Sequence, residues 1–260
     1  MNKTITLTPM MQQYMETKKQ YSDCILFYRL GDFYEMFFDD AITASKELEI
    51  TLTGKNCGLE ERAPMCGVPY HSVDSYLNRL VEKGYKVAIC EQVEDPQQAK
   101  GIVKREVVRV VTAGTNMNAQ ALDETKNNYI MCIVYIADRY GLAVADVSTG
   151  DYFVTELDSG RKLLDEIHKF SPSEIICNES FYMSGLDLDD LRHRLGMMIY
   201  SIDTHFFDDE MCARILKEHF HAASLEGMGL GDYNCGVIAA GALLKYLYET
   251  QKTSLSHITH

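Results

Sequence analysis

The stretch GDFYEMFFDD, Gly31 to Asp40, combines residue types that could read a nucleic-acid base. A glycine turn that offers an aromatic side chain, with a carboxylate two residues on, suits a wedge that unstacks a base step at a cost of roughly a few kcal/mol. Phe33 would be the wedge and Glu35 the carboxylate. The same letters allow a structural interpretation, since Phe33, Met36 and Phe37 have the i, i+3, i+4 spacing of a helix face packed on a core.

Other residues offer less chemistry. The sequence contains no G-x-S-x-G, H-E-x-x-H or G-x-G-x-x-G, and Gly54-Lys55 lacks the remaining residues of a phosphate-binding loop, so we expect no nucleotide hydrolysis. Asp138 and Asp146 alone do not supply the converging carboxylates of a two-metal nuclease. His71 and Asp74, one helical turn apart, fit a helix-start capping arrangement better than acid–base chemistry. We therefore expect no catalytic residue and no metal site.

Composition indicates a chain with two cores. It has 260 residues, 46% hydrophobic and 24% charged, and about 100 to 200 residues form one domain. No apolar run is long enough to cross a membrane and the N-terminus lacks a secretory signal, so we expect a cytoplasmic protein without a membrane partner. The eight cysteines are scattered singly, which predicts buried thiols in a reducing compartment and argues against zinc or disulfides.

Charge is distributed unevenly along the chain. The net charge is −13, but residues 1–115 hold 14 basic and 16 acidic side chains, so the other 11 basic and 22 acidic side chains place −11 in the remainder. An acidic total argues against nucleic-acid binding, whereas the near balance of the first part permits it. Lys100 to Arg109 is locally basic, and either a contact with a phosphate backbone or a solvated edge would explain it.

The first half predicts a mixed α/β sheet. Thr8 and Pro9 are the N-cap and first residue of a helix, and a second helix closes at Gly84 in the C′ position. The other expected elements are strands at 24–30, 50–53, 86–93 and 106–114, a short helix at 41–50, a loop at 54–72 and the body of the Gly84-capped helix at 73–81.

The second half predicts a ribonuclease H-like layered domain. A polar linker, 116–128, precedes three strands in a meander, and helices and strands then alternate. The expected strands are 129–136, 141–147, 151–157, 173–177 and 197–202, and the expected helices 159–170, 210–220 and 233–249. The last helix is apolar on most faces and needs a partner. The sequence then ends at QKTSLSHITH without a closing element, which we interpret as an interrupted chain.

Four stretches resemble one family. FYRLGDFYEMFFDDA, APMCGVPYHSVDSYL, VAICEQVEDP and KGIVKREVVRVVTAGT are similar, in order and spacing, to the N-terminal portion of the MutS family of DNA mismatch-recognition proteins. The resemblance is strong over the first 115 residues and more diffuse beyond. In that family Phe-x-Glu reads the mismatch. The resemblance therefore implies that Phe33 enters the minor groove and stacks on a mispaired or unpaired base while Glu35 hydrogen-bonds it; Met36 and Phe37 remain core residues.

The resemblance also implies a domain plan. The mismatch-recognition domain would be 1–115, the linker 116–128, the ribonuclease H-like connector domain 129–250, and the start of a helical core or lever region 251–260. Expected partners are mismatched double-stranded DNA, the partner protein MutL at the connector domain, and a second MutS subunit. ATP and magnesium belong to the full-length family protein, whose ATPase module lies beyond residue 260. This segment would therefore hold no cofactor and would not be an enzyme, and it would lie in the cytoplasm near the nucleoid.

Further residues are assigned by the same resemblance. Leu30, Met65 and Cys66 are candidates for supporting the wedge or contacting the groove, and Cys66 stands where family members often have a small residue. Candidates for DNA backbone contacts are Lys100, Lys104, Arg105 and Arg109. Two rival hypotheses remain: a protein-interaction scaffold whose Phe33 is purely core, and a metal-dependent nuclease.

Overall fold

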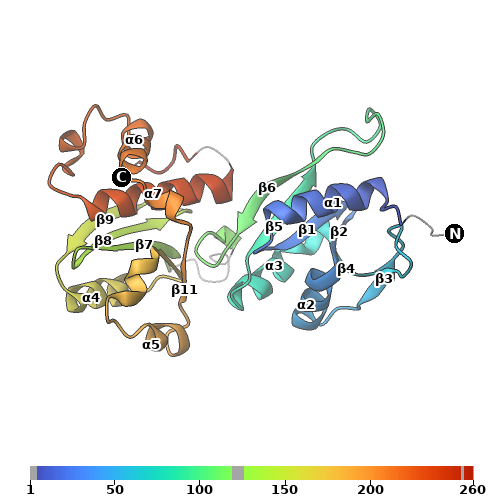
Figure 1. The fold of residues 1–260 in the computed structure, drawn as a ribbon, viewed down its shortest axis with the longest axis horizontal. Helices are drawn as coiled ribbons and strands as arrows, with labels where there is room; N and C mark the ends of the chain where they lie inside the picture. Colours follow the sequence, from blue (N-terminus) through green and yellow to red (C-terminus); the bar gives the residue numbers. More distant parts are fainter. Residues whose placement is uncertain (1–4, 119–125, 253–254, 260) are drawn as a thin grey trace. The chain divides into compact units, whose positions relative to one another are not determined.

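The computed structural model describes residues 5–118, 126–252 and 255–259. Contacts between residues divide the chain into two compact units, Met1–Thr112 and Ala113–His260. Each unit is built on one mixed sheet with helices on both faces (Figure 1). The expected fold class, two successive α/β domains, is confirmed.

The first unit contains a six-stranded sheet in the order β3-β4-β2-β1-β5-β6. Only the β1–β5 pair is parallel, and all other neighbours are antiparallel. The strands are β1 (Ile25–Leu30), β2 (Phe33–Phe37), β3 (Thr53–Lys55), β4 (Ala63–Pro69), β5 (Val87–Gln92) and β6 (Arg105–Val111).

Helices cover both faces of this sheet. The helix α1 (Pro9–Gln20) begins where the sequence predicts, because the Thr8 hydroxyl accepts a hydrogen bond from the Met11 amide at 3.4 Å. It packs Met11 and Tyr14 on one face. The helices α2 (Phe38–Leu48) and α3 (Val73–Glu82) pack on the other face, with Gly84 at the C′ position of α3. A short 3-10 turn, η1 (Tyr70–Ser72), precedes α3.

Three expectations for the first unit are wrong. Residues 33–37 form a strand and not a helix face, because Met36 and Phe37 point to opposite sides of the sheet and reach different cores. The strand expected at 50–53 begins only at Thr53. The loop expected at 54–72 contains β4, which lies between β2 and β3 and completes the sheet.

The second unit contains a five-stranded sheet in the order β11-β10-β7-β8-β9. The first three strands in chain order, β7, β8 and β9, form the expected antiparallel meander, and β10 runs parallel to both of its neighbours, β7 and β11. The strands are β7 (Tyr129–Ile136), β8 (Arg139–Asp146), β9 (Tyr152–Leu157), β10 (Glu174–Cys177) and β11 (Met198–Ser201). This arrangement confirms the ribonuclease H-like expectation.

Helices again lie on both faces. One face carries α4 (Gly160–Phe170) and α5 (Leu188–His193), and the other carries α6 (Asp209–His219) and α7 (Cys235–Gln251). The apolar α7 finds its partners in the sheet and in α6. Gly241 permits that close approach, because a Cβ there would lie 2.3 Å from the Cys212 Cβ. The unit also contains the 3-10 turns η3 (Glu179–Met183), η4 (Thr204–Phe207) and η5 (Glu226–Met228).

The expected linker at 116–128 lies partly outside the described residues. Its described ends belong to the second unit: Asn116 is buried, and the Asn128 side-chain amide donates to the Ala113 carbonyl at 3.0 Å. The Gly114 amide donates to the buried Glu174 carboxylate at 2.9 Å. No helix within the described ranges is long and apolar enough to cross a membrane.

All eight cysteines are buried and free. Burial raises the pKa of the Cys90 thiol to about 12 and that of the Cys177 thiol to about 11. The sequence prediction of buried thiols is confirmed.

Candidate nucleic-acid interface

The turn between β1 and β2 presents Phe33. Gly31 has φ 58°, in the left-handed region that costs a residue with a Cβ roughly 1 to 2 kcal/mol. The Gly31 carbonyl accepts from Arg29 Nε at 2.5 Å, and the Asp32 carbonyl accepts from the Tyr70 amide at 2.9 Å. Phe33 follows directly and is 47% exposed. These two hydrogen bonds fix the turn. Because Phe33 is half-exposed, the hypothesis that it is purely a core residue is wrong.

Phe33 and Glu35 lie on the same face of the sheet. Side chains alternate along a strand, so Phe33, Glu35 and Phe37 share the face that α1 covers. Phe37 is 1% exposed because α1 lies over it, with the Tyr14 ring centroid 4.9 Å from the Phe37 centroid. Residues two apart on a strand are separated by about 7 Å. An exposed aromatic ring and a carboxylate therefore occupy neighbouring positions, as a base-reading wedge requires.

Gly67 leaves space beside this pair. It lies on β4 directly opposite Glu35. A Cβ at this position would lie 3.6 Å from Glu35 Cγ and 3.8 Å from Phe33 Cδ1. A larger side chain would therefore contact both residues. Sequence reasoning missed Gly67, which stood within a stretch interpreted as a loop.

Glu35 forms an ion pair with Lys55. Lys55 Nζ donates to Glu35 Oε2 at 2.8 Å, and the two side chains are 33% and 15% exposed. Sequence reasoning considered Gly54-Lys55 only as part of an absent phosphate-binding loop. Periodicity offered no signal for this contact, because it joins the edge strand β3 to β2 across β4.

The three candidate support residues lie in two environments. Leu30 pairs with Phe33 across the hairpin, and Met65 pairs with Phe37; both are half-buried on the α1 face. Cys66 instead points into the opposite core, where its thiol donates to the Ala41 carbonyl at 3.5 Å. Burial raises the pKa of this thiol to about 11. Cys66 supports β2 from beneath and is not accessible to a groove.

Arg105 holds the hairpin from the side of β6. Its guanidinium Nε donates to the Arg29 carbonyl at 2.8 Å, and Nη1 donates to Gln13 Oε1 at 2.8 Å. The guanidinium carbon also lies 4.9 Å from the centroid of the Tyr28 ring. These contacts tie β6 to β1 and α1, so Arg105 is committed largely to protein contacts.

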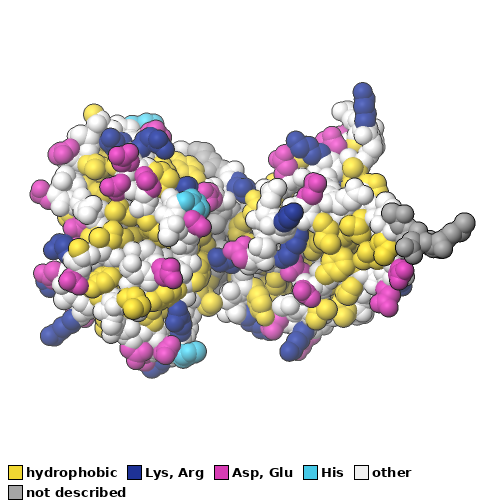
Figure 2. All heavy atoms as spheres, in the orientation of Figure 1, with side chains coloured by type: hydrophobic (Ala, Val, Ile, Leu, Met, Phe, Trp, Pro, Cys, Tyr) yellow, Lys and Arg dark blue, Asp and Glu magenta, His cyan; other side chains and the backbone are white. Residues whose placement is uncertain are grey.

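The other three basic candidates are dispersed. Lys100 is exposed in the long loop between β5 and β6, which projects beyond the sheet in Figure 1. Lys104 is exposed and lies 3.1 Å from Glu106 Oε1. Arg109 pairs with Ile89, and a register shift after Ile89 places it on the face opposite Arg105. In Figure 2 basic and acidic side chains are interspersed over the visible face of this unit.

The two aspartates considered for a nuclease site lie at opposite ends of β8. Asp138 accepts from the Tyr135 hydroxyl at 2.8 Å, whereas Asp146 accepts from the Ser148 amide at 2.9 Å. A strand of this length separates them by roughly 25 Å. Among the described residues, no group of three or more His, Cys, Asp or Glu side chains could hold a metal ion.

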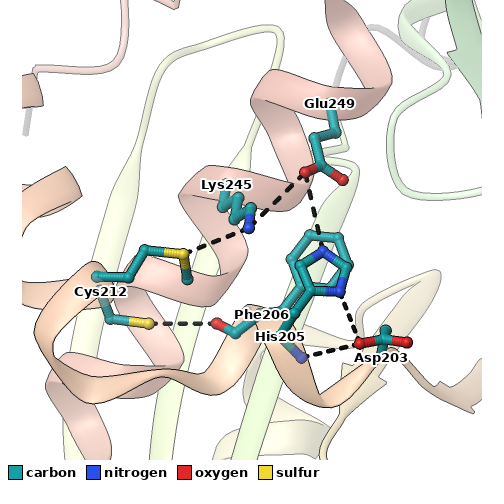
Figure 3. A network of polar contacts seen from close by, with 7 residues as sticks. Asp203, His205, Phe206, Cys212, Lys245 and Glu249 are labelled. Atoms are coloured by element: carbon teal, nitrogen blue, oxygen red, sulfur yellow. Dashed lines mark hydrogen bonds and ion pairs between the residues drawn. The ribbon is translucent and has the colours of Figure 1, made fainter.

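A polar network in the second unit joins η4 to α6 and α7 (Figure 3). His205 Nδ1 lies 2.6 Å from Asp203 Oδ1, and its Nε2 lies 4.0 Å from Glu249. Lys245 approaches the same Glu249 carboxylate at 3.9 Å. These contacts join η4 to α7 at the surface, so this network serves to hold the two helical segments together.

The structure thus defines a two-domain α/β protein. Its first unit carries a candidate base-reading hairpin, in which an exposed aromatic ring lies beside a carboxylate. The family described as MutS domain I matches residues 8–120, and MutS domain II matches residues 128–259. The chain therefore belongs to the MutS family.

Similar proteins support this assignment over nearly the whole chain. DNA mismatch repair protein MutS of Lachnoclostridium phytofermentans is 64% identical over 254 residues, which cover 98% of this chain and 27% of that protein. The proteins of the same name from Acetivibrio thermocellus and Clostridium tetani are 54% and 52% identical, over 97% of this chain and 29% and 28% of their own lengths. The chain thus spans less than a third of the length of these relatives.

Proposed function

We propose that the first unit of this chain recognises mismatched double-stranded DNA. One observation carries the proposal. Phe33, which is 47% exposed, and Glu35 lie on the same face of the β1–β2 hairpin. Membership of the MutS family and relatives named DNA mismatch repair proteins support it.

Phe33 enters the minor groove and stacks on a mispaired or unpaired base while the duplex bends away. Unstacking costs roughly a few kcal/mol per step, and the cost is lower where the pair is already weak. The deformation energy therefore discriminates without contacts specific to each base. The Glu35 carboxylate, repelled by the phosphates of ordinary DNA, penalises a matched duplex further.

Glu35 hydrogen-bonds the displaced base in one of two ways. An ionised carboxylate accepts from a base N–H such as thymine N3, and a protonated carboxyl donates to a purine N7.

Contacts with the DNA backbone come from the exposed lysines. Lys100 and Lys104 lie in the projecting β5–β6 loop or at its end, where an ammonium group can approach a phosphate. Arg105 acts mainly by supporting the hairpin, and Arg109 contacts DNA only if the duplex also reaches the other face of the sheet.

The second unit serves as a connector domain. Its −11 share of the net charge suits a protein partner better than DNA, and we assign to it the contact with MutL and the relay to other domains. The sequence contains no phosphate-binding loop, so we expect ATP and magnesium to bind outside this chain. We assign them, together with the contacts to a second MutS subunit, to the full-length protein, which acts in the cytoplasm at the nucleoid.

The test is binding to duplexes that carry an unpaired thymine or a matched pair, measured by fluorescence anisotropy at low salt. Phe33→Ala is compared with Phe153→Ala, since Phe153 is 46% exposed but lies in the second unit. Each variant is made in this chain and in the full-length Lachnoclostridium phytofermentans MutS whose matching segment is replaced by this chain. Thermal melts accompany each measurement.

We expect Phe33→Ala to abolish the preference for the unpaired thymine while melting close to the parent, and Phe153→Ala to retain it. Retained preference in the full-length Phe33→Ala protein contradicts the wedge and favours a protein-interaction role in which the exposed Phe33 does not read DNA. Cleavage of either duplex that depends on magnesium or manganese supports the nuclease hypothesis instead.

A further inference from the structure

The Glu35 carboxylate is held by one cation. Lys55 Nζ donates to Oε2 at 2.8 Å, and the Glu35 side chain is 15% exposed. Within the part of the chain that the structure describes, no other group hydrogen-bonds this carboxylate, so Oε1 is its open acceptor.

The fold holds the ammonium group in this position. Lys55 ends β3, a three-residue edge strand that pairs only with β4. Arg62 donates a hydrogen bond from Nη2 to the Gly54 carbonyl and so closes the free end of this strand pair. Lys55 Nζ lies 6.0 Å from the centroid of the buried Phe37 ring, an aromatic face that attracts a cation.

Neither residue opposite Glu35 can take the place of Lys55. Tyr28 and Gly67 lie opposite Glu35 on the two adjacent strands. The Tyr28 hydroxyl donates to Gln13 Oε1, and Gly67 has no side chain. Arg105, the cation stacked on the Tyr28 ring, is engaged by Gln13 and the Arg29 carbonyl.

We propose that Lys55 is a positioning residue that orients the base-reading carboxylate of Glu35. This inference rests on the proposed function of the hairpin. Holding Oε2 restricts the carboxylate to one orientation and leaves Oε1 for the displaced base. A charge-assisted hydrogen bond is stronger than a neutral one, so it can fix a side chain that would otherwise be mobile.

Charge provides the second part of the argument. A carboxylate approaching DNA is repelled by the phosphates, and the ammonium group of Lys55 offsets part of that repulsion at Glu35. An ionised carboxylate accepts hydrogen bonds but cannot donate them. Lys55 therefore favours bases that offer an N–H, such as an unpaired thymine through N3, over bases that offer only an acceptor.

The test is a double-mutant cycle in the full-length chimera that carries this chain, with Lys55→Met, Glu35→Gln and the double variant. Lys55→Arg is the conservative variant, because arginine keeps the charge and the donor. Lys46→Met is the matched control: Lys46 is an exposed lysine on α2, which packs on the opposite face of the sheet. Binding to duplexes with an unpaired thymine and with a matched pair is measured at one fixed low salt concentration.

We expect Lys55→Met to reduce the preference for the unpaired thymine by about ten- to a hundredfold, the range of one hydrogen bond to a charged group. Lys55→Arg restores most of it, and Lys46→Met leaves it unchanged. In the Glu35→Gln background the same Lys55→Met change has no further effect on preference, since the two residues act as one unit.

Two results overturn the inference: equal behaviour of Lys55→Met and Lys46→Met, or an equal loss from Lys55→Met with and without the Glu35 carboxylate. The second result would assign Lys55 to a phosphate. Phe33→Ala, measured in the same series, separates this failure from failure of the proposed function. If Phe33→Ala abolishes the preference and Lys55→Met does not, only the role of Lys55 is wrong.

Discussion

Phe33 and Phe37 lie on the same face of β2, four residues apart, yet the first is 47% exposed and the second 1%. The helix α1 covers the Phe37 end of the strand and leaves the Phe33 end open. At the buried end an aromatic ring stabilises the fold, and at the open end the same residue type is free for a ligand. One strand thus combines a rigid base with an exposed reader, and substitutions at its two ends should affect different measurements.

The largest expected effect is on stability at the buried end. Phe37→Ala removes a fully buried ring that contacts Tyr14, and we expect the free energy of unfolding to fall by about 3 to 5 kcal/mol. Urea unfolding of the first unit, followed by circular dichroism, measures the change. A loss below about 1 kcal/mol would mean that α1 does not pack on this end of β2.

The reactivity of a buried and an exposed thiol tests the same difference between the two environments. Cys66 lies directly opposite Met36, and burial raises its pKa from 9.0 to about 11, so at neutral pH it holds far less thiolate than an exposed cysteine. We expect Cys66 to resist alkylation until the protein unfolds, and Phe33→Cys to react readily. Mass spectrometry of peptides after iodoacetamide treatment measures both. Equal reactivity would contradict the difference between the two environments.

The sign of the accompanying pH dependence follows from the same shift. Because the folded-state pKa of the Cys66 thiol is raised, the unfolded chain loses its proton first. The stability contribution is complete below about pH 9 and is lost as the pH rises through about 11. Cys66→Ala should reduce the steepness of this alkaline decline in unfolding experiments, and an unchanged slope would exclude the contribution.

A third and smaller effect concerns the turn that separates the exposed end from β1. Gly31 has φ 58° and no atom within 4 Å of the position of a Cβ, so Gly31→Ala meets no clash and carries only the conformational cost of about 1 to 2 kcal/mol. Gly31→Asn should cost less, since asparagine tolerates this region. Both are compared in thermal melts, and equal losses would indicate a cause other than backbone conformation.

The sequence predicted the regular elements well where one period or one apolar run was unbroken. The helix α3 was predicted because its apolar residues face a single core, and β7 and β8 were predicted because they are continuous apolar runs, which are buried on both faces of the sheet. The strand β2 was misassigned because both of its faces are buried at one end, so Met36 and Phe37 are adjacent in sequence and buried in different cores. The strand β4 was missed because its proline, cysteine and glycine content resembles a loop.

The candidate site was only partly predictable for similar reasons. Phe33 and Glu35 were found from their types and spacing together with the family resemblance. Lys55 was not found, because its contact crosses β4 and depends on a strand pairing that no local pattern encodes. Arg109 was grouped with Arg105 by sequence proximity, and the register shift after Ile89 then placed the two on opposite faces.

The smallest effect on stability is expected at the exposed end of β2, which carries the candidate base-reading residue. Phe33→Ala removes a half-exposed ring, and we expect the free energy of unfolding to change by about 1 kcal/mol or less. The same urea experiment as for Phe37→Ala measures it, so the two ends are compared directly. A loss equal to that of Phe37→Ala would show that Phe33 packs as a core residue in solution. A small loss accompanied by failed mismatch binding would separate folding from reading within one strand of five residues.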